Sequence, residues 1–556
     1  MNRRKTFGQK ISLKCLLFAR LFSAFLLIFL SLSYFSCGPP PKTAAVPSPS
    51  LEFDVENSLA AAKKELDRAC YYGFREAVKI LEPLVAATAP WPQLRAKVLP
   101  LYIKSLLLLG VREKEIGIST PTTEKIASLL SLNKDFADLV EFYEIVRAVS
   151  VQSKGVMAYD DRQIEARVKS RDWEKEKLDW ERFREERQQR LKELERRAQE
   201  DELAAYFWLA GFFNLYLERE SNLKPKALLE LFPRSRLVRF KIAITSAPVA
   251  RKDLLEELLK EEPEFYEAHY FLGEVALRAG LLLTAENHFL EAWKAIPVSP
   301  IIAISLASVY FHLEELEKSL EMYESTLAIL PQYREAMLGR AICLSFLGRH
   351  EEAMKALREM IELGYWLMGE AHYWLAWNLY YLNQFQEALP HCEEAKGRLP
   401  TNSQVFSLTG AVALELNDLP RAEENLLKAL EFDASNAEAL LGLARLEARR
   451  ENWPKAADYY EKSGRVYENQ VHSIQARMKE IEASELSPER KQAQLRRKGA
   501  QLESVSLTRA TTIYNAANCY FSAGKITEAL RLAEEASSHP AFKQRADELI
   551  SRIKRQ

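Results

Sequence analysis

Hydrophobic and small residues recur along most of this chain at helical spacing, and from residue 266 onward the same two-helix pattern returns at a nearly constant interval. Residues 266–297 contain two amphipathic stretches, a break at Gly280-Leu281 and a closing Pro297. The small residue of the first stretch recurs at Gly273, Ala307, Ala341, Ala376, Gly410 and Ala444, and that of the second at Ala285, Ser319, Ala353, Ala388, Ala422 and Ala456. Every step is 34 residues except one of 35. A fixed period of this length with two helices per unit predicts a solenoid of stacked helix pairs.

The repeated unit resembles the tetratricopeptide repeat (TPR). Its best copy has Leu272-Gly273 in the first helix, Ala285 and Phe289 four residues apart in the second, and Pro297 at the end. Small residues let two helices cross closely, aromatic rings fill the space between them, and proline ends the second helix. The resemblance covers 237–548 and implies an all-α fold, a right-handed TPR-type α-solenoid.

The same patterns divide the chain into segments of different character. We expect a signal peptide over 1–37, a Pro/Ser-rich tether over 38–50, degenerate helix pairs over 51–158, a long charged helix over 159–205, connecting helices over 206–265, six TPR units over 266–465, an inserted helical hairpin over 466–510, and a last TPR unit with a capping helix over 511–556.

The fold therefore includes two long charged insertions that resemble coiled coils. Residues 160–205 alternate acidic and basic side chains, many of them four apart in the order that stabilises a helix, and carry only a weak apolar stripe. This helix is either an arm that contacts a partner or a solvated spacer between two halves of the solenoid. In the second insertion, Val471, Ile474, Met478 and Ile481 continue a helix beyond its repeat, and Ser487-Pro488 restarts the chain as another helix. Insertions in repeat proteins map to one face, which is often functional.

The first residues resemble a bacterial lipoprotein signal. A basic head of five residues and then Arg20 precede an uncharged apolar run over 21–35, which is short for a membrane span and ends at Ser36-Cys37-Gly38. The resemblance implies that Cys37 becomes the acylated first residue, and that the protein is a membrane-anchored lipoprotein of the bacterial cell envelope, facing the periplasm or the exterior. The alternatives are an uncleaved anchor helix and cleavage at another position. The Pro/Ser-rich stretch that follows suits a flexible tether between lipid and folded body.

Composition and motifs argue against several classes of function. The net charge of −1 gives no bulk attraction to nucleic acid, and acidic residues match the basic ones along the charged helix. The sequence motifs of a nucleophile elbow, a phosphate loop, a dinucleotide fingerprint and a zinc protease are absent. Cys70, Cys343, Cys392 and Cys519 are expected to be buried, unpaired thiols, and the histidines are scattered. We therefore expect no catalytic residue, no metal site and no cofactor.

Aromatic residues on the first helices supply the candidate binding site. The TPR resemblance implies that these helices line a concave groove, and it places there Tyr270, Phe311, Phe346, Tyr373, Trp377, Tyr380 and Tyr381. The first helix of the fourth repeat is aromatic on more than one face, and Tyr and Trp dominate protein-binding hot spots. Either this helix is the binding hot spot, or the charged arm or the hairpin encloses it.

These observations lead to one main hypothesis and two alternatives. The main hypothesis is a non-enzymatic scaffold that binds another protein through its groove, in envelope assembly or secretion. A glycan-binding or polysaccharide-export helper is the first alternative, because aromatic stripes also stack on sugars. The second is an enzyme with an unrecognised helical site.

Overall fold

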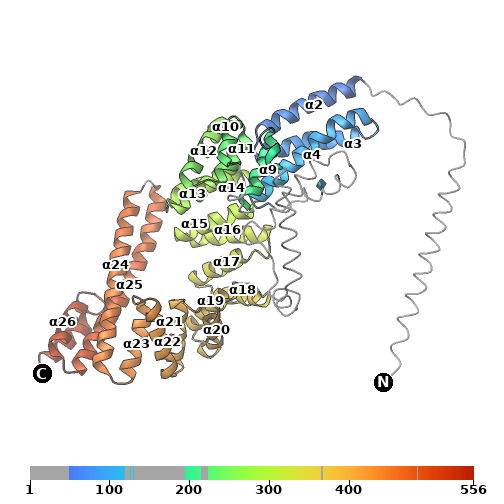
Figure 1. Ribbon diagram of the computed structural model, residues 1–556. Helices are drawn as coiled ribbons and strands as arrows, with labels where there is room; N and C mark the ends of the chain where they lie inside the picture. The colour runs from blue at the N-terminus through green and yellow to red at the C-terminus, as the bar shows by residue number, and fades with distance from the viewer. Residues whose placement is uncertain are drawn as a thin grey trace, which may run out of the picture.

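The computed structural model describes residues 49–118, 125–126, 129, 194–214, 223–364, 367–484 and 486–555. Every regular element over these residues is an α-helix, and the helices stack into a curved solenoid (Figure 1). This confirms the predicted all-α, TPR-type architecture. The signal, the tether up to residue 48 and the charged helix up to residue 193 lie outside the described residues.

The N-terminal part packs against the first repeat in one continuous hydrophobic core. Its helices are α2 (Pro49–Asp67), α3 (Tyr71–Ala87), α4 (Pro92–Glu115), α9 (Glu202–Asn214), α10 (Pro225–Leu231), α11 (Arg236–Thr245) and α12 (Pro248–Glu261). Helix α9 is apolar on all sides, and Tyr206, Phe207 and Trp208 are fully buried. A helical segment without a polar face must be covered all round, and residues 203–209 of α9 accordingly lie inside this core.

The repeats follow as helix pairs that cross at small residues. They are α13 (Tyr266–Arg278) with α14 (Leu282–Ala295), α15 (Pro300–His312) with α16 (Leu316–Ile329), α17 (Arg334–Phe346) with α18 (His350–Glu362), α19 (Met368–Tyr381) with α20 (Phe385–Arg398), α21 (Ser403–Glu415) with α22 (Leu419–Phe432), and α23 (Ala437–Arg449) with α24 (Trp453–Ala483). A Cβ atom on Gly273 would lie 2.6 Å from the ring of Phe289, and one on Gly410 would lie 2.5 Å from Leu426. The recurrent small residues are thus required by the close helix crossing.

One residue in each turn between paired helices has a left-handed backbone. These residues are Gly280, Glu314, Gly348, Asn383, Asn417 and Glu451, with φ between 58° and 74°. The amide of the next residue donates to a carbonyl five residues back, as Glu315 N does to Tyr310 O at 2.8 Å. This hydrogen bond is the usual C-terminal cap of a helix, and glycine or asparagine adopts it at least cost. Glutamate at two of these turns is therefore unusual.

The last paired helix is much longer than the others and forms a hairpin. Helix α24 is antiparallel to α25 (Pro488–Ser522), and the two rise together away from the later repeats (Figure 1). Helix α25 then pairs with α26 (Ile526–Ser537), and α27 (Lys543–Ile553) covers the end. We refer to α24 and α25 together as the hairpin. Over the described residues no helix is both long and apolar enough to cross a membrane.

A buried ion pair joins the N-terminal helices to the first repeat. Arg112 on α4 has no exposed surface, and its Nη1 lies 2.5 Å from Glu267 Oε1 on α13. The same Glu267 oxygen accepts from the backbone N of Tyr71 at 2.7 Å, and the guanidinium lies 3.8 Å from the ring centroid of Phe240. We call this contact the N-terminal junction.

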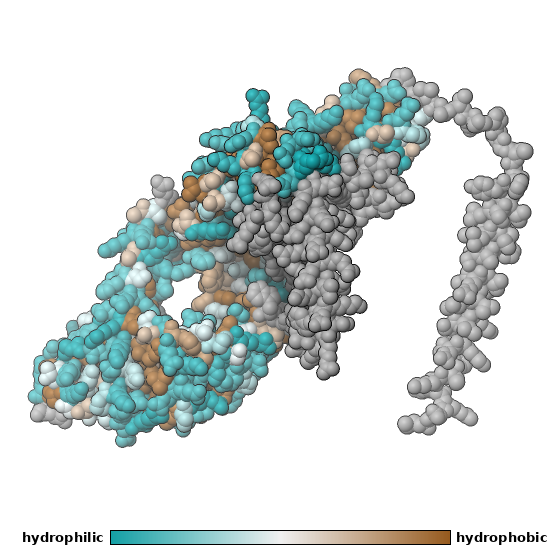
Figure 2. All heavy atoms as spheres, viewed as in Figure 1, coloured by the Kyte–Doolittle hydropathy of each residue, from teal (hydrophilic) through white to brown (hydrophobic). Residues whose placement is uncertain are grey.

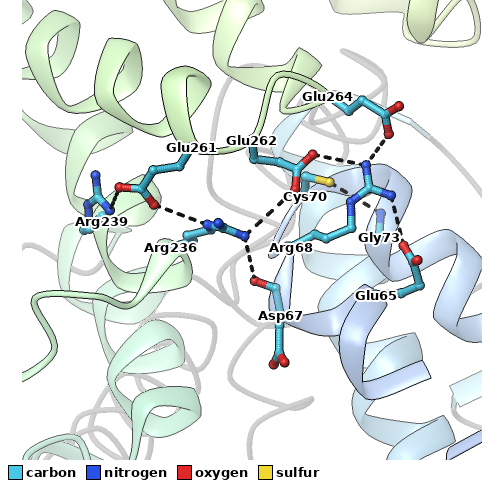
Figure 3. A network of polar contacts seen from close by, with 10 residues as sticks. All are labelled: Glu65, Asp67, Arg68, Cys70, Gly73, Arg236, Arg239, Glu261, Glu262 and Glu264. Carbon is cyan, nitrogen blue, oxygen red and sulfur yellow. Dashed lines mark hydrogen bonds and ion pairs between the residues drawn. The ribbon is translucent and has the colours of Figure 1, made fainter. Parts of the chain in front are cut away.

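A second, outer network surrounds this junction. Arg68 pairs with Glu65 at 2.9 Å and Glu262 at 3.2 Å, and also with Glu264 (Figure 3). Arg236 contacts Glu261 at 3.3 Å and donates to the backbone O of Asp67 at 3.2 Å. The junction therefore combines an apolar core with ion pairs at two depths.

Candidate functional site

The predicted groove residues do not all lie on an exposed surface. Tyr270 on α13 is only 3% exposed, packs against Phe271 and Phe289, and donates its hydroxyl to Glu274 at 3.0 Å. The structure therefore places Tyr270 in the core of the first repeat, where a partner cannot reach it while the repeat stays folded. Tyr373 is half-buried, and its burial raises the pKa of its hydroxyl to about 12, so the phenol stays neutral.

The remaining predicted residues form one connected aromatic surface together with Trp374. Its members are Phe311 on α15, Phe346 on α17, and Trp374, Trp377, Tyr380 and Tyr381 on α19. Ring centroids lie 6.0 Å apart for Phe311 and Phe346, 6.0 Å for Phe346 and Trp377, and 4.0 Å for Trp377 and Tyr381. Trp374, which was not among the predicted groove residues, joins through Phe346 at 5.5 Å. The aromatic surface thus spans three consecutive repeats.

Part of this surface is open to solvent. Phe346 is 51% exposed and Tyr381 56% exposed, while the other four rings are partly buried. Large exposed aromatic groups that touch one another are characteristic of interaction sites on folded proteins. The aromatic surface is therefore a candidate binding site rather than a part of the core.

Hydrogen bonds behind the rings hold the surface in one conformation. The imidazole of His350 stacks on Tyr381, with centroids 5.8 Å apart and an interplanar angle of 16°. His350 Nδ1 lies 2.8 Å from Oδ1 of the buried Asn378, whose Nδ2 donates to Ser345 Oγ at 2.8 Å and to Trp374 O at 2.7 Å. A rigid surface loses little conformational entropy when it binds a ligand.

Two arginines of α23 near the aromatic surface are paired with groups of α21. Arg445 on α23 donates to Glu415 Oε1 on α21 at 2.5 Å, and Arg449 donates to the backbone O of Leu414. At the base of the hairpin, burial raises the pKa of Tyr467, and the nearby Glu438 and Tyr381 raise it further. Tyr467 is buried, so the hairpin borders the aromatic surface at this end.

Two histidine pairs occupy equivalent positions three repeats apart. Nδ1 of His269 lies 2.9 Å from Nδ1 of His288, and the His372–His391 pair has the same distance. Burial lowers the pKa of all four rings, that of His372 to about 4, so one ring of each pair can donate while the other accepts. Sequence reasoning missed these pairs, although both histidines recur at the same repeat positions. Over the described residues, no group of three or more His, Cys, Asp or Glu could hold a metal ion.

The four described cysteines are buried, as the sequence predicted. Burial raises the pKa of Cys70 to about 12, of Cys392 to about 12 and of Cys519 to about 11. A thiol that stays protonated is a poor nucleophile, so these cysteines are structural. Cys37 lies outside the described residues.

Comparisons with known proteins identify the repeats. Family models described as tetratricopeptide repeat match residues 247–300, 335–363 and 409–464. The chain is 29% identical over 152 residues to the BBSome complex member BBS4 of Mus musculus, a match that covers 26% of this chain and 28% of that protein. These matches confirm TPR repeats in the chain. Such repeats form a protein-interaction scaffold, and they are typical of proteins without enzymatic activity.

Solved structures of TPR proteins are also similar to parts of the chain. YrrB, described as a TPR protein with an unusual peptide-binding site, is 21% identical, with 34% of this chain and 97% of YrrB covered and a TM-score of 0.28. A TPR protein from Parabacteroides merdae is 16% identical, with 49% and 98% covered and a TM-score of 0.35. The protein pilF of Pseudomonas aeruginosa is 21% identical, with 36% and 91% covered and a TM-score of 0.33.

Proposed function

We propose that this protein is a non-enzymatic scaffold of the bacterial cell envelope that binds an extended segment of another protein on its aromatic surface. The observation that carries the proposal is the cluster of exposed, touching rings on the first helices of three TPR units. The lipid on Cys37 anchors the scaffold to a membrane, and the scaffold functions in envelope assembly or secretion.

The chemistry of the surface favours an apolar segment. Tyr and Trp rings offer large contact areas with few rotatable bonds, so ordering them on binding costs little entropy. The charge of Arg445 is neutralised by Glu415, so this arginine does not select an acidic partner. An extended segment with aliphatic or proline side chains can lie along the rings from Phe311 to Tyr381.

The experiment tests the surface with a matched control. A photo-crosslinking amino acid at Phe346 of the full chain is irradiated in cells, and the captured proteins are identified by mass spectrometry. Trp377→Ala is expected to abolish most of the capture, because removing a hot-spot ring costs about 2 kcal/mol, or roughly thirtyfold in Kd. Phe53→Ala removes a ring that is 66% exposed on α2 and should leave the capture unchanged. Capture that survives Trp377→Ala in a folded variant contradicts the proposal.

The glycan-binding alternative uses the same rings and is not favoured by the TPR matches. This alternative predicts that the protein is retained on a polysaccharide column and that Trp377→Ala abolishes the retention. That result would show that the ligand is a sugar chain and not a protein segment.

The anchor is tested separately. Incorporation of a labelled fatty acid is expected in the wild type and absent in Cys37→Ala. If the wild type takes up no label, the lipid anchor is wrong, whereas the binding surface is still judged by the crosslinking result.

A further inference from the structure

The tip of the hairpin crosses back to the first two repeats and contacts them through charged side chains. Helix α25 places Arg490, Gln494, Arg497 and Lys498 on one face, at spacings of four, three and one. Arg490 Nη1 lies 2.7 Å from Glu286 on α14, and its Nε donates to Glu315 at 2.7 Å. Glu286 and Glu315 are both buried.

Three further bonds continue this contact along the turn before α16. Gln494 Nε2 donates to Glu315 Oε1 at 3.4 Å, Arg497 Nη1 donates to the backbone O of Glu314 at 3.0 Å, and Lys498 pairs with the Glu314 carboxylate. Glu314 is one of the two glutamates with a left-handed backbone. Its φ of 58° orients a carbonyl and a carboxylate of the same turn toward α25. We call the whole set of bonds the latch contact.

This contact closes the curved solenoid. The first helices α15, α17 and α19 face the hairpin in Figure 1, and the hairpin spans from the later repeats to α13 and α14. The space-filling view shows an opening between the hairpin and the middle repeats (Figure 2). The aromatic surface lies on these first helices, with the hairpin base at Tyr467 beside its far end.

The latch contact is built to separate more easily than a packed core. The hairpin helices pack closely against each other, whereas long side chains bridge them to α14–α16. Clefts remain on both sides of Gln494, one beside Leu313 and Arg497 and another beside Leu282 and Ile481. The outer pairs of the contact, Arg497 with Glu317 and Lys498 with Glu314, are open to solvent and are therefore weakened by salt, unlike apolar packing.

We infer that the hairpin is a latch that closes the solenoid into a ring over the aromatic surface, and that the partner segment enters when the latch opens. The closed ring follows from the fold alone, whereas the entry of the partner segment rests on the proposed function. A folded domain cannot reach rings inside a closed ring, so an extended segment is the kind of partner that this arrangement admits.

Spin-label distances test the closure. Labels are attached at Ala493→Cys on the hairpin and Glu321→Cys on α16 of the full chain, with Cys15 and Cys37 replaced by Ser. The four buried cysteines do not react, for the reason given above. We expect one narrow distance distribution for the latched protein, and a broad distribution at longer distances for Arg490→Glu, which faces two buried carboxylates. Lys479→Glu reverses an exposed charge elsewhere on the hairpin and should leave the narrow distribution unchanged.

A size-selective reagent tests the entry. A cysteine at Phe346 is treated with N-ethylmaleimide and, in parallel, with a maleimide carried on a 5-kDa polyethylene glycol. We expect Arg490→Glu to accelerate the reaction with the large reagent several-fold while the rate with the small one stays the same. The Lys479→Glu control should change neither rate.

The two experiments distinguish the closure of the hairpin from its control of access to the aromatic surface. A narrow distance distribution in a folded Arg490→Glu protein overturns the latch. If Arg490→Glu gives a broad distance distribution but the large maleimide reacts no faster, the hairpin moves without controlling access to the aromatic surface, and the proposed gate is wrong. Neither result bears on the proposed binding of a protein segment, which is contradicted if Trp377→Ala leaves crosslinking intact.

Discussion

The N-terminal junction and the latch contact both join distant parts of the chain through arginine and glutamate, but their surroundings differ. Arg112 and Glu267 are fully buried, and the rings of Phe74, Phe240 and Phe265 surround the guanidinium. At the latch contact, Glu286 and Glu315 are also buried, but Arg490 is partly exposed and the neighbouring Gln494 lines a cleft. The same ion pair therefore belongs to a fixed core in one region and to a separable contact in the other.

The difference shows that the packing around an ion pair determines whether the pair stabilises a fixed core or a contact that can open. In a water-free core, removal of one partner leaves an uncompensated buried charge, which costs several kcal/mol. At the latch contact, opening exposes the carboxylates to water, which then replaces the lost partner at smaller cost. Three predictions test this contrast.

The largest effect is expected at the N-terminal junction. Arg112→Ala leaves Glu267 buried without its cation, and we expect a loss of about 3–5 kcal/mol in the free energy of unfolding of this region. Hydrogen exchange of α3, α4 and α13, together with chemical denaturation, measures it. Arg236→Ala removes an exposed pair of the outer network and serves as control, with an expected cost of about 0–1 kcal/mol. Equal effects of the two substitutions would contradict the contrast.

Acid is expected to open the latch contact, and the size of its effect on stability should lie between those of the other two predictions. Burial alone would raise the pKa of Glu315, but hydrogen bonds from Lys318 and Arg490 outweigh it and hold the pKa below its usual value of 4.5. A carboxyl whose pKa is lowered in the closed state stabilises that state above pH 4.5, and the stabilisation is lost as the pH falls through the lowered pKa.

Spin-label distances measured from pH 7 downward check this. The expected loss is about 1.5–3 kcal/mol, the contribution of a hydrogen bond to a charged group. Glu286, Glu314 and Tyr310 face the same site, so Glu315→Gln separates their contributions. This variant should reduce the pH dependence, and an unchanged pH profile would rule out Glu315 as the titrating group.

The smallest effect is expected at the two left-handed glutamates. Glu451→Gly relieves the strain of a side chain at φ 58°, and we expect the free energy of unfolding to rise by about 0.5–1 kcal/mol. Glu314→Gly relieves the same strain but removes the carboxylate that Lys498 contacts. It should therefore also broaden the distance between hairpin and α16, which Glu451→Gly should not. The pair of variants fails to support the latch if both leave that distance unchanged.

Sequence reasoning reached the repeat architecture because its signal is local. Gly273 and Gly410 were predicted at helix crossings, and a side chain at either position would collide with the paired helix. The aromatic candidates were harder, because helix position alone does not fix the direction of a long side chain. Tyr270 and Trp377 were both assigned to the groove, yet Tyr270 packs in the core against Phe289 while Trp377 lies beside the half-exposed Tyr381.

The left-handed glutamates and the histidine pairs could not be predicted from the repeat pattern. The six left-handed turn residues share the repeat spacing, but glutamate at two of them gives no local turn signal. The histidine pairs each join two helices of one repeat, and two isolated histidines 19 residues apart indicate no contact by themselves.

The sequence by itself determined the helix pairs, their period and the extension of two helices beyond it, because helix formation and pairwise crossing depend on residues close together in the chain. Only the tertiary structure decided where the hairpin ends. Arg490 and Glu315 are 175 residues apart. Their meeting depends on the curvature summed over every intervening repeat, and small rotations at each helix crossing set that curvature. No local pattern encodes such a sum, so the closed ring and the surface inside it emerge only from the folded chain.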